Sequence, residues 1–214
     1  MSKSSALDSL LESAITQFSE HGYAGASLRK IANGADVPLS TIHFYFKSKS
    51  ELFLEVRRHA WKEIDEDRNA LLDKLLLQTT SVDMRDIVSS LSYPIVRRAF
   101  SENRRDRDLI FVVRHFMSIS NPGSELRMLD RADRTVERWI GAMMECCPVF
   151  TREDAIWAFS FMIGAIYSWQ LIDHRYDRMI GAKSSQTMDR VNADIVEFCC
   201  SGIHAMAALR TPRA

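Results

Sequence analysis

The sequence of 214 residues predicts an all-α protein, on two observations. Glycine and proline are scarce, at 8 and 5 residues, whereas an all-β chain needs many turns. Apolar residues recur at the three- and four-residue steps of a helix face, and no segment alternates as a strand would. With 46% hydrophobic and 26% charged residues, the composition is that of a globular protein that buries a core. We therefore expect about nine helices.

The first fifty residues are predicted to hold three short helices. The first ends near Gly22, because glycine favours a helix stop, and Ser27 suits the N-cap of the second. Asp36 lies where the chain must turn, and aspartate tolerates left-handed backbone. Pro38 suits the first position of a third helix that ends near Tyr45. The apolar stripe of the first helix consists of Leu7, Leu10, Leu11, Ala14, Ile15 and Phe18.

A longer fourth helix is expected to follow. Ser48 and Glu51 have the spacing of a capping box, in which each side chain accepts a hydrogen bond from a backbone N–H at the helix start. The apolar residues after Leu52 keep a helical period and extend toward Leu77. Two short helices joined by a tight turn, with a longer helix leaving them, make up a helix-turn-helix arrangement.

The rest of the chain is also predicted to be helical. Pro94 is expected to kink or split its helix, because proline lacks the backbone donor that a helix interior needs. The predicted division is a helix-turn-helix domain at residues 1–50 and a larger helical domain at residues 51–214. The later helices are expected at roughly 82–101, 104–118, 123–146, 151–177 and 185–209.

The N-terminal region contains five short motifs whose residues and spacing are informative: Glu20-His21-Gly22-Tyr23, Ser27-Leu28-Arg29-Lys30-Ile31-Ala32, Val37 with Thr41-Ile42, Phe46-Lys47-Ser48-Lys49, and Glu51-Leu52. Together they resemble the TetR family of bacterial transcriptional regulators over about residues 7–56. The resemblance implies an all-α homodimer that binds double-stranded DNA and a small-molecule effector. This chain departs from the usual family residues at Lys30, Asp36, Pro38, Ser40 and His43, which makes the operator sequence harder to infer.

The resemblance implies that the third helix enters the major groove of a palindromic operator while its neighbours hold phosphates. Ile42 and Phe46 are expected to face inward. Thr41 can contact phosphate or a thymine methyl group, and His43 can donate to a base or a phosphate. Between residues 27 and 49, four basic residues stand against one acidic residue, in a chain of zero formal charge. The predicted DNA-binding residues are Ser27, Arg29, Lys30, Leu39, Ser40, Thr41, His43, Phe44, Tyr45 and Lys49.

The segment from Ala155 to Ile172 carries no formal charge. A helix buried between partners explains it better than a membrane span, because small and polar residues interrupt it and charged residues follow at once. The resemblance implies that the last two long helices form a four-helix interface with a second copy, and a monomeric core is the alternative. The predicted interface residues are Ser160, Gly164, Ser168, Ile195, Cys199, Gly202 and Met206.

The middle of the chain combines large apolar side chains with interleaved polar ones. This composition fits a pocket for a hydrophobic or aromatic effector, although each aromatic taken alone is more typical of a core. Effector binding would shift the population toward a form that releases DNA, and an effector that promotes binding is left open. The predicted pocket residues are Tyr93, Phe100, Phe111, Arg114, His115, Trp139, Met143, Trp157 and Phe161.

Other classes of function have weaker support. No triad order, glycine-rich phosphate loop or metal-ligand spacing occurs, so we expect no enzymatic activity, cofactor or metal. The adjacent pairs Cys146-Cys147 and Cys199-Cys200 are expected to be reduced thiols of a cytoplasmic protein, with redox or metal sensing as the lesser alternative. The main alternative to a regulator is a helical adaptor that has lost DNA binding, which the departures at Asp36, Pro38 and Ser40 keep open.

Overall fold

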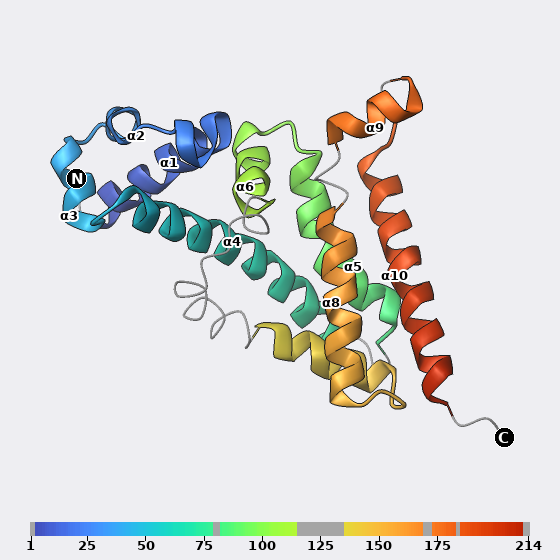
Figure 1. Cartoon of the computed structure of the whole chain (residues 1–214). Coiled ribbons are helices and arrows are strands. Elements are labelled where there is room, and N and C mark those ends of the chain that lie inside the picture. The colour runs from blue at the N-terminus through green and yellow to red at the C-terminus, as the bar shows by residue number, and fades with distance from the viewer. Residues whose placement is uncertain (1–2, 79–81, 115–134, 169–172, 183–184, 212–214) are drawn as a thin grey trace. The chain divides into compact units, whose positions relative to one another are not determined.

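A computed structural model describes residues 3–78, 82–114, 135–168, 173–182 and 185–211 (Figure 1). All regular secondary structure in these ranges is helical, as the sequence predicts. The chain divides into two compact units that are not continuous in sequence. The first consists of Met1–Glu63 and Ser101–Ser120, and the second of Ile64–Phe100 and Asn121–Ala214. Each is described by itself.

The first unit joins four helices and the start of a fifth. It contains α1 (Lys3–Gly25), α2 (Leu28–Gly34), α3 (Leu39–Tyr45), the N-terminal part of α4 (Lys49–Gln78), and α6 (Arg104–Arg114). α1 packs against both α2 and α6, and α2 packs against α3. The predicted apolar stripe of α1 supplies the centre, where Phe18 meets Phe53 of α4 edge-on at 4.8 Å between ring centroids. Residues with no exposed surface here include Leu10, Ala14, Ile31, Ile42, Leu52 and Val56.

The predicted caps and turns of this unit are present, with local differences. Asp36 has φ 53°, the left-handed conformation expected for the turn between α2 and α3. Pro38 is the N-cap of α3 and not its first helical residue. Gly22, with φ 65° and ψ 178°, breaks α1 where its end is predicted, and helical structure then continues to Gly25. The Ser48 hydroxyl accepts the Glu51 N–H at 3.1 Å, and the Glu51 carboxylate accepts the Lys47 N–H at 2.8 Å.

The second unit is built around α5 and α10. It contains the C-terminal part of α4, α5 (Met84–Ala99), a helical segment at 135–146, α8 (Arg152–Ser168), α9 (Asp173–Ile180) and α10 (Met188–Arg210). α10 packs along α5 and α8, and α8 also contacts α5 (Figure 1). Its core includes Ile87, Val88, Leu91, Ile95, Trp139, Met143, Ala155 and Ile166.

Pro94 lies inside α5, so of the two outcomes predicted for its helix, a kink or a split, the split does not occur. Of the helix expected at 151–177, the structure describes α8 (Arg152–Ser168) and α9 (Asp173–Ile180), and residues 169–172 lie outside the described residues. Among the described residues no helix is both long and apolar enough to cross a membrane.

Candidate nucleic-acid interface

The third helix has one face in the core and one at the surface. Ile42 is fully buried and Phe46 is 6% exposed, so both point inward as predicted. On the other side Ser40, His43 and Phe44 are exposed, and the Phe44 side chain reaches 68%. The remaining predicted contact residues of α3, which are Leu39, Thr41 and Tyr45, are half-buried. The helix therefore presents a continuous set of side chains that a partner can reach.

Basic residues lie on both sides of α3 in the sequence. Arg29 and Lys30 of α2 are exposed, as is Lys47 between α3 and α4, whereas Ser27 is half-buried at the N-cap of α2. The Ser27 hydroxyl makes no capping hydrogen bond. The one acidic residue between positions 27 and 49, Asp36, is also exposed, on the turn that precedes α3. Cations beside an exposed helix are the arrangement that phosphate contacts require.

Lys49, a predicted phosphate contact, is half-buried at the start of α4. Its ammonium group donates to the Ala24 carbonyl at 3.1 Å and lies 5.1 Å from the centre of the Tyr23 ring. Because a lysine ammonium has three donors, Lys49 can keep the Ala24 contact and still bind a phosphate. It joins the start of α4 to the end of α1 directly beside the helix-turn-helix.

The packing of α2 against α1 depends on two small residues. The Ser13 hydroxyl of α1 donates to the Ile31 carbonyl of α2 at 2.8 Å. Gly34, at the end of α2, lies so close to the Ser13 hydroxyl that a Cβ atom would collide with it. This contact fixes the orientation of α2, and through the turn at Asp36 it fixes that of α3.

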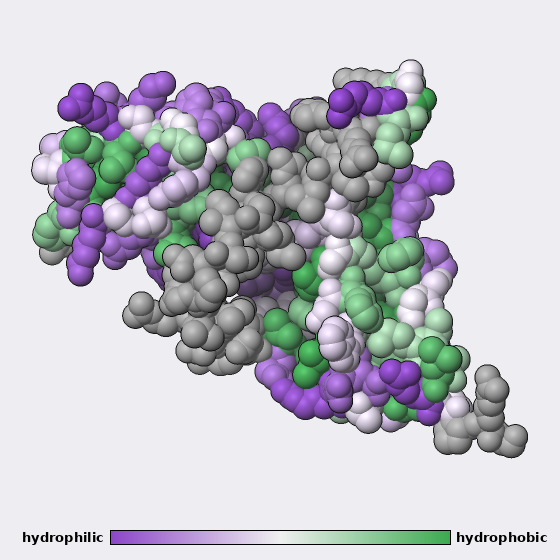
Figure 2. All heavy atoms as spheres, viewed as in Figure 1, coloured by the Kyte–Doolittle hydropathy of each residue, from purple (hydrophilic) through white to green (hydrophobic). Residues whose placement is uncertain are grey.

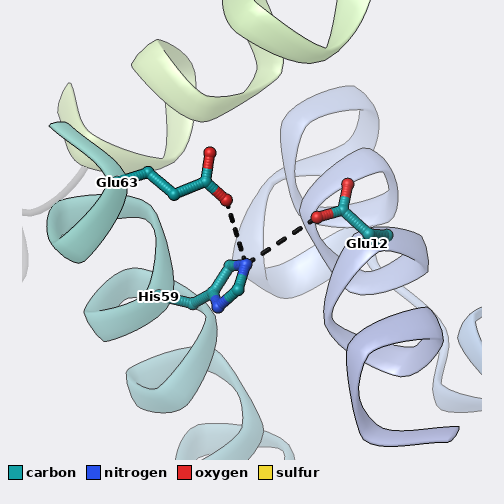
Figure 3. Close-up of side chains that lie close together, drawn as sticks. All are labelled: Glu12, His59 and Glu63. Carbon is teal, nitrogen blue, oxygen red and sulfur yellow. Dashed lines mark ion pairs between the residues drawn. The ribbon is translucent and has the colours of Figure 1, made fainter. Parts of the chain in front are cut away.

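A charged cluster joins three helices of the first unit (Figure 3). His59 and Glu63 lie one turn apart on α4, and the His59 Nε2 atom is 3.1 Å from Glu63 and 3.7 Å from Glu12 of α1. Arg105 of α6 donates to both carboxylates, with its Nε atom 2.6 Å from Glu12 and its Nη1 atom 2.9 Å from Glu63. We call these four residues the charged cluster.

The charges of this cluster stabilise one another. Hydrogen bonds from Arg105 and His59 lower the pKa of Glu12 to about 2. Bonds from His59 and, more weakly, Arg105 lower the pKa of Glu63 to about 2. The two carboxylates raise the pKa of His59 to about 9, so the imidazole is protonated at neutral pH.

Three members of the cluster have the donor set of a metal site. The ligand atoms of Glu12, His59 and Glu63 all lie within 4.8 Å of one another. In this structure Arg105 takes both carboxylates, so the arginine already supplies the positive charge that a cation would bring. Sequence reasoning missed this cluster, although the His59–Glu63 spacing of one helical turn was a visible signal.

The residues predicted to line an effector pocket are divided between the two units. Trp139 and Met143 are buried in the second unit, where the Trp139 indole donates to the Ser90 hydroxyl at 3.3 Å. Tyr93 is half-buried and lines a hollow of about 230 Å³ between α4 and α5. Phe111 belongs to the first unit, whereas Phe100, the C-cap residue of α5, belongs to the second and is 38% exposed. His115 and the side chain of Arg114 lie outside the described residues.

Two further predicted pocket residues lie on the surface of α8. Trp157 is 54% and Phe161 62% exposed, and their rings stack with centroids 5.9 Å apart. They share that face with Ile156, which is 43% exposed, and with predicted dimer residues of α8. Figure 2 shows this surface in pale and green colours. The predicted dimer-interface residues that are exposed on this face of α8 are Ser160, Gly164 and Ser168.

The predicted dimer residues of α10 are divided between surface and core. Gly202 is exposed and Met206 half-buried, but Ile195 and Cys199 are 9% and 6% exposed and pack inside the unit. Larger apolar side chains of α10 do reach the surface, namely Phe198 at 72% and Leu209 at 75%. An exposed apolar face thus exists on both helices, with partly different residues from those predicted.

The four cysteines are free thiols. Cys199 and Cys200 are buried, and Cys146 donates to the Val82 carbonyl at 2.8 Å. Burial raises the pKa of each thiol above its ordinary value, and that of Cys199 to about 11. Because the thiolate is the reactive form, these environments favour inert thiols.

Two short helices, α2 and α3, joined by a tight turn, with the second anchored on one side and exposed on the other, have the arrangement of a helix-turn-helix DNA-binding domain. Residues 10–56 match the model of the bacterial regulatory proteins of the tetR family. Residues 90–202 match that of the tetracyclin repressor-like C-terminal domain, which covers over half of the chain. The chain belongs to the TetR family of transcriptional regulators.

Individual relatives agree with this assignment. The regulator AcrR of Shigella flexneri is 26% identical over 176 residues, which are 78% of this chain and 80% of that protein. The probable regulator YttP of Bacillus subtilis is 30% identical over 92 residues, 42% of this chain and 44% of that protein. The fatty acid degradation regulator FadR of Bacillus halodurans has the same fold, with a TM-score of 0.70 at 17% identity over 94% of this chain and 98% of its own.

A second FadR structure, from Bacillus subtilis, was solved in complex with stearoyl-CoA. It superposes with a TM-score of 0.68 at 15% identity, over 92% of this chain and 99% of that chain. At these identities the solved structures establish the shared fold.

Proposed function

We propose that this TetR-family regulator is a dimeric repressor that binds a palindromic operator through α3 and releases it when a small hydrophobic or aromatic molecule binds the second unit. The observation that carries the proposal is the placement of α3, with Ile42 and Phe46 inside and Ser40, His43 and Phe44 outside. Exposed Arg29, Lys30 and Lys47 supply phosphate contacts on either side in the sequence. We expect the protein to act in the cytoplasm.

The apolar face of α8 and α10 supports dimerisation. Ile156, Trp157 and Phe161 expose large apolar surfaces, and Ser160 and Gly164 between them leave room for a second helix. A second copy is the occupant we propose, because a two-fold axis pairs identical faces and places two recognition helices on one duplex.

The interior of the second unit supports effector binding. The interior contains large apolar groups such as Trp139 and Met143, and the Trp139 indole donates to the Ser90 hydroxyl, so apolar and polar groups are mixed as in small-molecule sites. Arg68, 3% exposed, donates to the Leu91 carbonyl at 2.9 Å and to the Tyr167 hydroxyl at 3.0 Å, so a cation also lies in this interior. The FadR structure solved with stearoyl-CoA gives a precedent, in a protein of the same fold, for binding a molecule that carries a long apolar chain.

The DNA-binding proposal is tested by selection from a randomised duplex library, followed by fluorescence anisotropy on the selected sequence. We expect a palindrome with half-site centres about one helical turn apart, and an affinity that falls steeply with salt. A library from which the wild-type protein enriches no sequence would contradict the proposal and favour the adaptor alternative. Adding acyl-CoA or aromatic compounds to the preformed complex then tests release by an effector.

A further inference from the structure

We infer that α3 distinguishes operator bases chiefly through thymine methyl groups, and that Phe44 is the main specificity-determining residue. The inference rests on the proposed function and adds to it the base chemistry that the helix recognises. It follows from the side chains that α3 contains, the side chains that it lacks, and the exposure of each.

The helix lacks every residue that makes two hydrogen bonds to one base. Its sequence from Leu39 to Tyr45 contains no Arg, Lys, Asn, Gln, Asp or Glu. Arginine and lysine are the usual partners of guanine, asparagine and glutamine of adenine, and aspartate and glutamate of cytosine. Recognition by paired hydrogen bonds from α3 is therefore excluded by composition.

The side chains that remain are apolar or make single hydrogen bonds. Phe44 is the largest exposed group, at 68%, and the half-buried Leu39 and Thr41 add methyl groups. His43 and Ser40 are exposed and can each form a hydrogen bond, which alone separates the four base pairs poorly. In the major groove the thymine C5-methyl group is the apolar feature of the base edges. Binding is most favourable when the exposed phenyl ring covers that methyl group, because covering a polar base edge would break hydrogen bonds to water.

The structure holds Phe44 on the outer side of α3. Ile42 anchors the helix in the core, and the Phe44 ring meets the neighbouring Tyr45 ring edge-on, at 5.1 Å and 82°. The first unit favours a nucleic acid over an apolar protein surface as partner, because Arg29 and Lys30 of the preceding helix α2 and Lys47 just after α3 are exposed cations.

The test replaces single thymines of the selected operator by uracil, which removes the methyl group and keeps every hydrogen-bonding group. At one or two positions in each half-site we expect wild-type affinity to fall about fourfold, the factor expected when one buried methyl-sized group is removed. At the same positions a 5-methylcytosine·guanine pair should bind about fourfold more tightly than a cytosine·guanine pair. Equal affinity for thymine and uracil at every position would overturn the inference while leaving DNA binding intact. Failure to select any DNA would overturn the proposed function, and the inference with it.

Variants then assign the effect to a residue. Phe44→Ala should bind the thymine and uracil duplexes equally, and Phe44→Leu should keep part of the difference, because leucine still covers a methyl group. Lys47→Ala is the matched control: it should weaken binding to both duplexes by the same factor and leave their ratio unchanged. A Phe44→Ala protein that still prefers thymine by the wild-type factor would overturn the assignment to Phe44.

Discussion

The two units of this protein offer different surfaces to their partners. The first unit offers a narrow helix with one exposed aromatic ring among basic residues, supported by helices that the charged cluster of Glu12, His59, Glu63 and Arg105 joins. The second offers a broad apolar face on α8 and α10, where Trp157, Phe161 and Phe198 are more than half exposed. The first surface suits a charged polymer and the second suits another apolar surface. The comparison supports the proposal that separate regions carry DNA recognition and self-association.

The largest expected effect comes from a charge placed on the apolar face of α8. Trp157→Glu should abolish dimerisation and reduce operator affinity by about a hundredfold or more, because an unpaired charge at a buried interface costs about 3–5 kcal/mol. Analytical ultracentrifugation and anisotropy measure the two effects. Leu77→Glu is the matched control, since Leu77 is 86% exposed on α4. A Trp157→Glu protein that remains a dimer would contradict the assignment of this face.

The next effect tests whether the charged cluster holds the first unit together. Arg105→Met removes the cation that both carboxylates share, and should lower the free energy of unfolding by about 1–3 kcal/mol, toward the lower end because the Arg105 side chain is 40% exposed. Urea unfolding measures this change. Arg58→Met, which breaks an exposed pair with Glu55 inside α4, is the control and should cost less than about 0.5 kcal/mol. Equal effects of the two substitutions would remove any special role from the cluster.

The same cluster predicts a pH dependence. The pKa of His59 is raised to about 9, so its stabilisation is complete below about 6.5 and is lost as the pH rises toward 9. The pKa values of Glu12 and Glu63 are lowered to about 2, so theirs is complete above about 4.5 and is lost as the pH falls toward 2. The contribution of the cluster should be largest between pH 4.5 and 6.5.

Urea midpoints measured across this range check that expectation. His59→Gln should flatten the decline between pH 6.5 and 9. It should also reduce, without removing, the loss of stability at acid pH, because Arg105 still lowers the pKa values of both carboxylates. An NMR titration that gave His59 its ordinary pKa near 6.5 would show that the two carboxylates do not hold its proton.

The smallest expected effect distinguishes the roles of two neighbouring lysines, Lys47 and Lys49. Lys49→Ala should lower stability by about 0.5–1 kcal/mol, because Lys49 contacts the Ala24 carbonyl and the Tyr23 ring, and should also weaken operator binding. Lys47→Ala, at an exposed site, should weaken binding and reduce the slope of affinity against salt by about one, with unchanged stability. Thermal unfolding and salt titrations distinguish the two. Identical behaviour would show that Lys49 is not a structural contact.

Local patterns explain why the first three helices could be predicted closely. The conformation at Asp36, the hydrogen bond between Ser48 and Glu51, and the inward direction of Ile42 all depend on residues a few positions apart. Such features follow from backbone sterics, capping and helical periodicity. The exposed side chains of α3 follow from the same pattern, since they lie opposite its buried residues.

Features that join distant segments could not be predicted in this way. The charged cluster brings together α1, α4 and α6, and nothing near Glu12 in the sequence indicates Arg105 as its partner. Trp157 and Phe161 were assigned to a pocket because a large apolar residue has the same periodicity whether it faces a core or a partner. Their exposure depends on which helices cover α8, and only the tertiary structure supplies that information.

Dimethyl sulfate footprinting of the selected operator tests the central claim, that α3 lies in a major groove, most directly. The reagent methylates guanine N7 in the major groove, so bound protein should protect guanines there. We predict two protected stretches with centres about 10 base pairs apart, both lost when Phe44 and His43 are replaced together by alanine. Protection confined to the minor groove would contradict the claim that α3 lies in a major groove. Protection of the major groove that the double replacement left unchanged would contradict it as well.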